Sequence, residues 1–197
     1  MNKCPSCRHF ACASPVDRDG WTSNLANMEI ISMEIREFVN SEKLGFIATV
    51  CPDGTPNLSP KGTTIAWDDE HLAFADIHSP GTVNNLLINP SIEINIVDIF
   101  SRKGYRFKGS AEILSDGPLF NDILSYYRAA GSKHLIKNII LVKVDRILPV
   151  MSPAYDMQLS EEEIRNRWIH YWSDMNTKNK IDLKNMPAKP AKNKNCT

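Results

Sequence analysis

The sequence predicts a mainly β protein with flanking α-helices, in which six antiparallel strands form a barrel. The first observation behind this prediction is a series of β-rich runs joined mostly by short turns, a pattern typical of antiparallel sheets. The second is the small number of helical segments, which fall before, between and after these runs. The third is the composition, 42% hydrophobic and 23% charged over 197 residues, which excludes a disordered or fibrous chain.

The first part of the predicted fold is one helix followed by three extended runs. Apolar residues at helical spacing predict an amphipathic helix over residues 27–41. A strand is expected over 44–51, and the turn residues 52–56 predict a hairpin with the next extended run, 57–67. After a second turn, the short apolar run 72–77 predicts another strand.

The middle of the chain adds two helices and three strands. Ser79 is a preferred N-cap residue, Pro80 is favoured at the first helical position, and Asn89-Pro90 ends a helix that begins there. Apolar and polar residues alternate in the two runs that follow, as in half-buried strands. A further helix stops at Gly131. These later elements are expected over residues 92–97, 105–112, 118–130 and, for the sixth strand, 136–144.

The last predicted element is a helix over residues 161–174. Ser160 and Glu163 form a capping box, and Leu159 and Ile164 are placed as a hydrophobic staple. Ile164, Trp168, Tyr171 and Trp172 share one helical face. We expect this face to pack on the barrel, because aromatic residues at helical spacing more often pack than form a lid over a ligand.

Both ends of the chain are predicted to be appendages. Residues 1–24, which are rich in cysteine, and residues 176–197, which are rich in Lys, Asn and Pro, lack apolar periodicity, so we expect both to be flexible and the folded domain to cover 25–175. The formal net charge is zero, but 176–197 contain six lysines and one acidic residue, which leaves the remainder acidic. The body is therefore not predicted to bind nucleic acid.

Membrane and secretory signals are not found in the sequence. No run approaches the roughly eighteen apolar residues of a membrane span, and the first ten residues lack the apolar core of a signal peptide. Five cysteines are an odd number and three crowd into the first twelve residues, which does not predict a disulfide framework. We expect a cytoplasmic protein that does not bind membranes.

Two cysteine features allow functional interpretations. Cys4, Cys7, His9 and Cys12 offer four metal ligands, but they lie within nine residues and have no second half-site, so flexible free thiols are favoured over a structural zinc site. Cys51 at a strand end is more often an inert core residue than a redox thiol. No metal site is predicted.

The segment from Ser79 to Thr82 is a candidate anion site. A helix that begins directly after a strand presents unpaired N–H groups and a partial positive charge, and Gly81 leaves room for a close ligand. Plain helix capping is the commoner cause of such a pattern. Lys61 strengthens the anion interpretation, since it lies in Ser59-Pro60-Lys61-Gly62-Thr63, a strand segment with a cation and hydroxyls where an apolar run is normal.

A second basic cluster begins the next long strand. It reads Ser101-Arg102-Lys103-Gly104-Tyr105-Arg106. A solvated hairpin loop explains such a cluster as well as an anion site does.

Four short motifs in one order carry a resemblance to a known family. They are DGTP (53–56), SPKG (59–62), SPGT (79–82) and RKGYRFKG (102–109). In this order residues 45–114 resemble the pyridoxamine 5'-phosphate oxidase-like, FMN-binding split-barrel proteins. LPVMSPAYD (148–156) and the following helix look like an uncharacterised microbial branch of that superfamily.

This resemblance implies a split β-barrel that binds FMN as a homodimer, with the flavin at the subunit interface and a small molecule as substrate. It implies that the segment Ser59 to Thr63 lines the flavin and that the segment Ser79 to Thr82 holds the phosphate. The basic cluster from Arg102 to Arg106 would complete the site. The implied cofactor-binding residues are Ser59, Lys61, Gly62, Thr63, Ser79, Gly81, Thr82, Arg102, Lys103 and Arg106. The better-known oxidases carry an Arg/Lys pair at the helix start, where this chain has Pro80-Gly81-Thr82, and end in an Arg-Leu-x-Pro segment that this chain lacks. Pyridoxamine phosphate is therefore not the expected substrate.

The function expected from this resemblance is that of an FMN-binding oxidoreductase acting on an unidentified small molecule. The cofactor would supply the redox chemistry, and no side chain is identified as a catalytic acid or base. The alternatives are a flavin-binding or flavin-sensing module without turnover, and a split barrel that uses a deazaflavin or haem.

Overall fold

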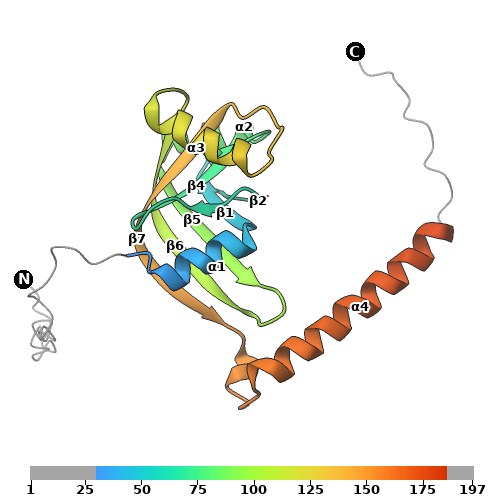
Figure 1. Ribbon diagram of the computed structural model, residues 1–197. Coiled ribbons are helices and arrows are strands. Elements are labelled where there is room, and N and C mark those ends of the chain that lie inside the picture. Colours follow the sequence, from blue (N-terminus) through green and yellow to red (C-terminus); the bar gives the residue numbers. More distant parts are fainter. Residues whose placement is uncertain (1–29, 186–197) are drawn as a thin grey trace, which may run out of the picture.

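A curled antiparallel sheet forms the body of the computed structural model, which describes residues 30–185 (Figure 1). Its strand order is β2-β1-β5-β6-β7-β4-β3, and every neighbouring pair is antiparallel. The strands are β1 Gly45–Val50, β2 Pro56–Lys61, β3 Ile65–Ala66, β4 His71–Asp76, β5 Ser91–Asp98, β6 Lys103–Leu114 and β7 Asn138–Met151. This confirms the expected mainly β fold with a split-barrel sheet.

The described sheet has seven strands, so the prediction of six was wrong. The extended run expected over residues 57–67 breaks into β2 and β3, because Gly62, Thr63 and Thr64 form a turn. β2 and β3 are the two edges of the sheet, and this short turn joins them. A sheet whose edges are tied by three residues must curl. Lys61 therefore lies at the end of an edge strand, whereas the sequence predicted that it lies inside a longer strand. We call the place where residues 62–64 join the two sheet edges the barrel seam.

Four α-helices and one 3-10 turn lie around the described sheet (Figure 1). They are α1 Met33–Glu42, α2 Pro80–Ile88, α3 Pro118–Ala129, η1 Pro153–Tyr155 and α4 Glu161–Asn185. α1 begins later than the predicted residue 27, because Ser32 is its N-cap and accepts a hydrogen bond from Ile35 N–H at 3.4 Å. The preceding Ile31 is buried and donates its N–H to the Asp69 carbonyl, so this residue belongs to an anchored connection.

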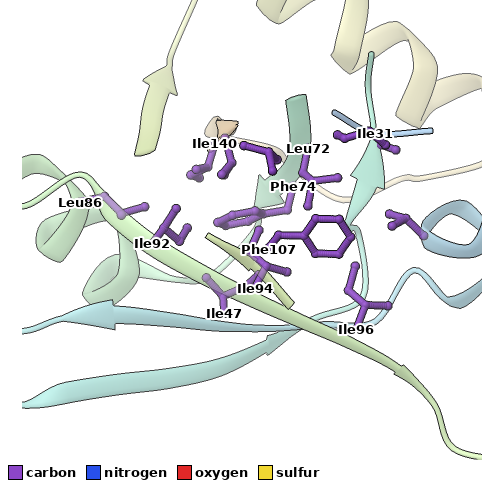
Figure 2. Packing of buried hydrophobic residues seen from close by; sticks show 14 residues of the cluster. Ile31, Ile47, Leu72, Phe74, Leu86, Ile92, Ile94, Ile96, Phe107 and Ile140 are labelled. Atoms are coloured by element: carbon purple, nitrogen blue, oxygen red, sulfur yellow. The ribbon is translucent and has the colours of Figure 1, made fainter. Parts of the chain in front are cut away.

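The main core fills the space between the curled sheet, α1 and α2 (Figure 2). Alternate residues of β5 point inward, and Ile94 and Ile96 pack there with Phe74 of β4 and Phe107 of β6. Each such side chain stabilises the fold by roughly 1.5–3 kcal/mol relative to an exposed position. A second cluster, with Ile123 and other residues of α3 and β7, lies under α3. These two clusters fix the strands and helices that carry the candidate site.

The last helix differs from the prediction. The expected capping box is present, since Glu163 Oε2 accepts from Ser160 N–H at 2.8 Å and Ser160 Oγ accepts from Glu163 N–H at 3.3 Å. Ile164 is buried, but Tyr171 and Trp172 are 47% and 41% exposed, and α4 extends away from the barrel (Figure 1). The expectation that this face packs on the barrel therefore holds for Ile164 and Trp168 but was wrong for Tyr171 and Trp172. It also runs to Asn185, past the helix end expected at residue 174.

Ion pairs explain how the start of α4 is held without such packing. Arg165 donates to Asp98 at 2.7 Å and Lys103 pairs with Glu161 at 2.7 Å, which ties the first turns to the β5–β6 hairpin. Trp168 still contacts the hairpin through Arg102, whereas Tyr171 and Trp172 further along the helix are exposed. Sequence periodicity shows which residues share a helical face, but it does not show whether a partner surface lies opposite that face.

Helices that could span a membrane are not found among residues 30–185. The same residues hold no cluster of three or more metal-ligating His, Cys, Asp or Glu side chains. Cys51 is a half-buried free thiol whose sulfur lies 3.6 Å from Asn85 Nδ2. The candidate ligands Cys4, Cys7, His9 and Cys12 lie outside the described residues.

Candidate functional site

Two predicted anion-binding segments come together at the seam of the barrel. The ammonium of Lys61 donates to Ser59 Oγ at 2.7 Å, and Ser59 Oγ lies within hydrogen-bond distance, 3.3 Å, of Thr82 Oγ1. Lys61 and Ser59 come from β2, whereas Thr82 comes from the first turn of α2 and is 3% exposed. The chain thus places a cation, two hydroxyl groups and a helix N-terminus side by side.

The start of α2 leaves backbone donors free. The first N–H groups of an α-helix have no acceptor within the helix, and because Pro80 has none, the donors of this turn are those of Gly81 and Thr82. A Cβ atom built on Gly81 meets no other atom within 4 Å, so open space lies over this residue. Free donors beside open space are suited to an anion.

Ser79 does not cap α2 in the expected way. It occupies the N-cap position, but its hydroxyl makes no capping hydrogen bond. Its own N–H donates to Asp76 Oδ1 at 2.9 Å. Asp76 is 5% exposed, and its Oδ2 accepts from Asn138 Nδ2 at 2.9 Å. The start of α2 is therefore fixed by a carboxylate at the end of β4.

The electrostatics of Lys61 differ from those of a surface lysine. Burial lowers the pKa of its ammonium, and the nearby carboxylate of Asp76 acts in the opposite direction. Among residues 30–178, whose side chains are described, Lys61 forms no ion pair. A half-buried cation whose direct partner is a hydroxyl is free to hold an additional anion.

Hydrogen bonds from three elements hold the turn after Lys61. Tyr127 of α3 donates its hydroxyl to the Thr63 carbonyl at 2.7 Å, and Thr63 Oγ1 accepts from the Ala75 N–H of β4 at 3.0 Å. Thr64 Oγ1 donates back to the Lys61 carbonyl at 3.1 Å. Burial raises the pKa of Tyr127, so its hydroxyl remains a donor throughout the ordinary pH range. A Cβ built on Gly62 meets nothing within 4 Å, so the turn is both fixed and open.

A hollow of about 270 Å³ adjoins this turn. It lies between Gly62 and Thr63 on one side and the end of α3 on the other, where Tyr126, Tyr127 and His134 contribute to its wall. The hydroxyl of Ser132, on the same wall, is buried and lacks a hydrogen-bond partner among the described residues. Space for a small molecule is therefore present next to the predicted anion-binding residues.

The basic residues of the β5–β6 hairpin lie elsewhere in the chain and have other partners. Arg102 stacks over the Trp168 ring at 4.2 Å from its centroid, Lys103 pairs with Glu161, and Arg106 pairs with Glu93 at 3.3 Å. The structure brings none of the three into contact with Lys61 or Thr82. Their role at the flavin stays a prediction, and it would require a second subunit to bring them to the site.

A larger hollow, about 360 Å³, lies beside this hairpin and is unsuited to an anion. It is bounded by α1, the hairpin, the end of β7 and the start of α4, and four carboxylates line it against two basic side chains. Burial, followed by the charge of Asp98, raises the pKa of Glu42 in its wall. The smaller hollow beside Gly62 and Thr63 has no carboxylate among the described residues of its wall and is therefore better suited to an anion.

Two residues of the site were not predicted from the sequence. Asp76 looks like an ordinary strand-end acid, and Tyr127 looks like one of two adjacent aromatic residues packed in a helix. The spacing of Asp76, three residues before Ser79, matches a side-chain acceptor for the residue at a helix start, and this is the signal that could have identified it. No sequence signal marks the Tyr127 hydroxyl, because its acceptor is a carbonyl 64 residues away.

The donor set at the seam matches the needs of a phosphate group. An ammonium, hydroxyl groups and free N–H groups of a helix start are the donors that proteins use for phosphate. The fold and this site together define a class of small barrel with a candidate anion site between a strand end and a helix start. The chain belongs to the pyridoxamine 5'-phosphate oxidase family, whose model matches residues 31–150.

Solved structures with the same fold agree with this assignment. The tagged HupZ protein of Group A Streptococcus is 32% identical over 62% of this chain and 95% of its own chain, with a TM-score of 0.57. An FMN-binding protein from Syntrophomonas wolfei subsp. wolfei is 19% identical over 60% of this chain and 84% of its own, with a TM-score of 0.52, which supports the fold alone. No curated protein matches the sequence.

Proposed function

We propose that this protein binds FMN, with the phosphate held at the start of α2 beside Lys61. The observation that carries the proposal is the contact chain from Lys61 through Ser59 to Thr82, which joins a cation without an ion-pair partner in the described chain to a helix N-terminus. The family supports it, and one solved structure of the same fold is described as FMN-binding. A plain helix cap accounts for neither the half-buried lysine nor the open space over Gly81.

The residues of the seam would divide the work of binding. Lys61 and the N–H groups of Gly81 and Thr82 would donate to the phosphate, while Ser59 keeps the ammonium in place. Gly62 and Thr63 would line the flavin from a turn that Tyr127 holds. Bound FMN would supply hydride or electron transfer, which supports an oxidoreductase acting on a small molecule. The chain's own part is to bind and orient the cofactor, and we assign no catalytic side chain.

A homodimer is part of the proposal. The outer face of β1 and β2 is apolar, since Phe46, Val50 and Leu58 are 41%, 37% and 65% exposed, and the register sets them beside Pro56 and Pro60. An exposed apolar strip on an edge of the sheet is typical of an interface between subunits. A second copy on this face would bring further residues to the flavin. Light scattering of the purified protein should give twice the chain mass.

An absorption spectrum of the purified protein, followed by titration with FMN, tests the proposed function. We expect the two visible bands of an oxidised flavin and saturable quenching of FMN fluorescence. A Soret band would indicate haem and a deazaflavin spectrum the related cofactor, and either result would replace FMN. Reduction by NAD(P)H in steady state would separate an enzyme from a flavin-binding module without turnover. A cytoplasmic location stays a prediction.

A further inference from the structure

Asp76 is a buried carboxylate that the sequence analysis did not single out. It is 5% exposed and forms no ion pair within residues 30–178. An isolated buried carboxylate is costly unless hydrogen bonds satisfy it. Both of its oxygens are satisfied here, Oδ1 by Ser79 N–H and Oδ2 by Asn138 Nδ2, each at 2.9 Å. The charge of Asp76 is therefore tolerated in the interior as long as both of these hydrogen bonds are kept.

The hydrogen bond to Ser79 controls where α2 begins. Ser79 stands at the N-cap with a backbone conformation of φ −137° and ψ 50°, and its own side chain makes no capping bond. Asp76 Oδ1 is therefore the side-chain acceptor that holds the entry to this helix. The N–H groups of Gly81 and Thr82 follow within three residues, so this bond contributes to setting their direction.

Asp76 is also tied to the opposite wall of the site. Its partner Asn138 lies directly across from it in the β4–β7 ladder. The backbone carbonyl of Asp76 also accepts from Lys137 N–H at 3.1 Å. Its charge acts on Lys61 from the end of β4. The carboxylate thus fixes the helix start relative to two strands and faces the cation that completes the donor set.

We propose that Asp76 is a positioning residue for the phosphate site, acting through its hydrogen bond to Ser79 N–H and not through its charge. This inference rests on the proposed function, because it explains how the FMN phosphate is held. It goes beyond that function by naming a residue that touches no ligand and that selects FMN over riboflavin, which lacks the phosphate. The predicted consequence is that removing the acceptor lowers the affinity for FMN and leaves the affinity for riboflavin unchanged.

The test is a fluorescence titration of the full-length protein with FMN and with riboflavin at neutral pH. Asp76→Ala removes the acceptor and should reduce the preference for FMN at least tenfold. Asp76→Asn removes the charge and keeps one acceptor oxygen for Ser79 N–H, and the amide of Asn138 can turn its oxygen toward the new NH2 group, so this variant should retain the preference within threefold. A variant that merely loosens the fold would weaken both ligands equally, so the ratio of the two affinities isolates positioning from stability.

Asp68→Ala is the matched control. Asp68 likewise accepts backbone N–H groups, from Glu70 and His71 at 2.8 Å, but it lies at the opposite end of β4. This variant should lose stability without changing the FMN preference.

If Asp76→Ala keeps the wild-type ratio of the two affinities, or Asp76→Asn loses as much of the preference as Asp76→Ala, the inference is wrong. If Asp76→Ala does not fold, Asp76→Asn alone decides, since a tenfold loss there contradicts the hydrogen-bond role. A wild-type protein without any FMN preference would instead refute the proposed function.

Discussion

The barrel seam and the β5–β6 hairpin carry similar basic residues, yet the structure uses them differently. At the hairpin, Lys103 and Arg106 pair with carboxylates and Arg102 stacks on an aromatic ring. At the seam, Lys61 contacts a hydroxyl and forms no ion pair with the described side chains. Two of the hairpin cations, Arg102 and Lys103, contact α4 and Arg106 pairs with a neighbouring strand, whereas the seam cation is available for a ligand.

This difference separates two kinds of basic cluster that look alike in a sequence. Exposed pairs such as Lys103 with Glu161 stabilise a protein by about 0–1 kcal/mol, so the hairpin charges mainly orient the start of α4. At the half-buried Lys61, burial makes the charged form less stable, and the pKa of the ammonium is lowered as a result. A folded chain keeps such a residue where an anion compensates it. Four predictions test this comparison, beginning with the largest effect.

Gly81→Val should abolish FMN binding while the fold survives. The open space over Gly81 shows that the protein itself leaves room for a side chain, and Gly81 is not among the glycines with positive φ. A branched side chain would fill the space that the phosphate needs. Fluorescence titration and thermal melting of the same preparation measure both effects. Wild-type affinity in this variant would move the phosphate away from α2.

Lys61→Ala should weaken FMN binding by about 1.5–3 kcal/mol, or roughly tenfold to a hundredfold, through loss of a charge-assisted hydrogen bond. Riboflavin binding should change little. Lys103→Ala is the matched variant from the hairpin, and the comparison predicts a clearly smaller loss, because Glu161 already occupies that ammonium. Equal losses would show instead that a hairpin from the second subunit completes the site.

FMN affinity should fall at alkaline pH, and the fall should begin at a lower pH than it would with a lysine of ordinary pKa. The Lys61 ammonium is charged below its pKa, and burial lowers that pKa, so the attraction for phosphate is complete near neutrality and is lost as the pH rises through the lowered value. In Lys61→Arg the guanidinium remains charged over the same range, and this loss should disappear. Parallel titrations with riboflavin subtract any ionisation of the flavin itself.

Ser79→Ala should have the smallest effect, below about 0.5 kcal/mol on the free energy of unfolding, as for surface substitutions without a defined contact. The sequence alone predicts a larger loss, because Ser79 looks like a capping residue worth about 0.5–2 kcal/mol. The structure gives its hydroxyl no capping bond. Thermal and denaturant unfolding of the two proteins decide between these values.

Local patterns predicted most of the barrel and one half of the site. Alternation in β5 and the cap and stop residues of α2 gave those elements nearly their observed bounds, because both signals depend on neighbours in sequence. The closeness of Lys61 and Thr82, which Ser59 bridges, was implied by the family resemblance and not by a local pattern. The break between β2 and β3 was missed, since Gly62 and Thr64 make a turn only where the sheet edges meet.

Contacts between distant segments could not be predicted from residue patterns. Asp76 bonds to Asn138 across a ladder, and Tyr127 bonds to Thr63 from a separate helix, so neither role is written in a local spacing. The exposed face of α4 was mistaken for a packed one for the same reason. Its periodicity is real, but beyond its first turns α4 extends away from the barrel (Figure 1).

The ratio of the wild-type affinities for FMN and riboflavin tests the central claim most directly. The two ligands share the flavin ring and differ in the phosphate, so their ratio measures what the seam contributes. With Lys61, the hydroxyl groups and the start of α2 acting together, FMN should bind at least about tenfold more tightly, as expected for one or more charge-assisted hydrogen bonds. Equal affinities would contradict the account, because the seam would then bind no phosphate.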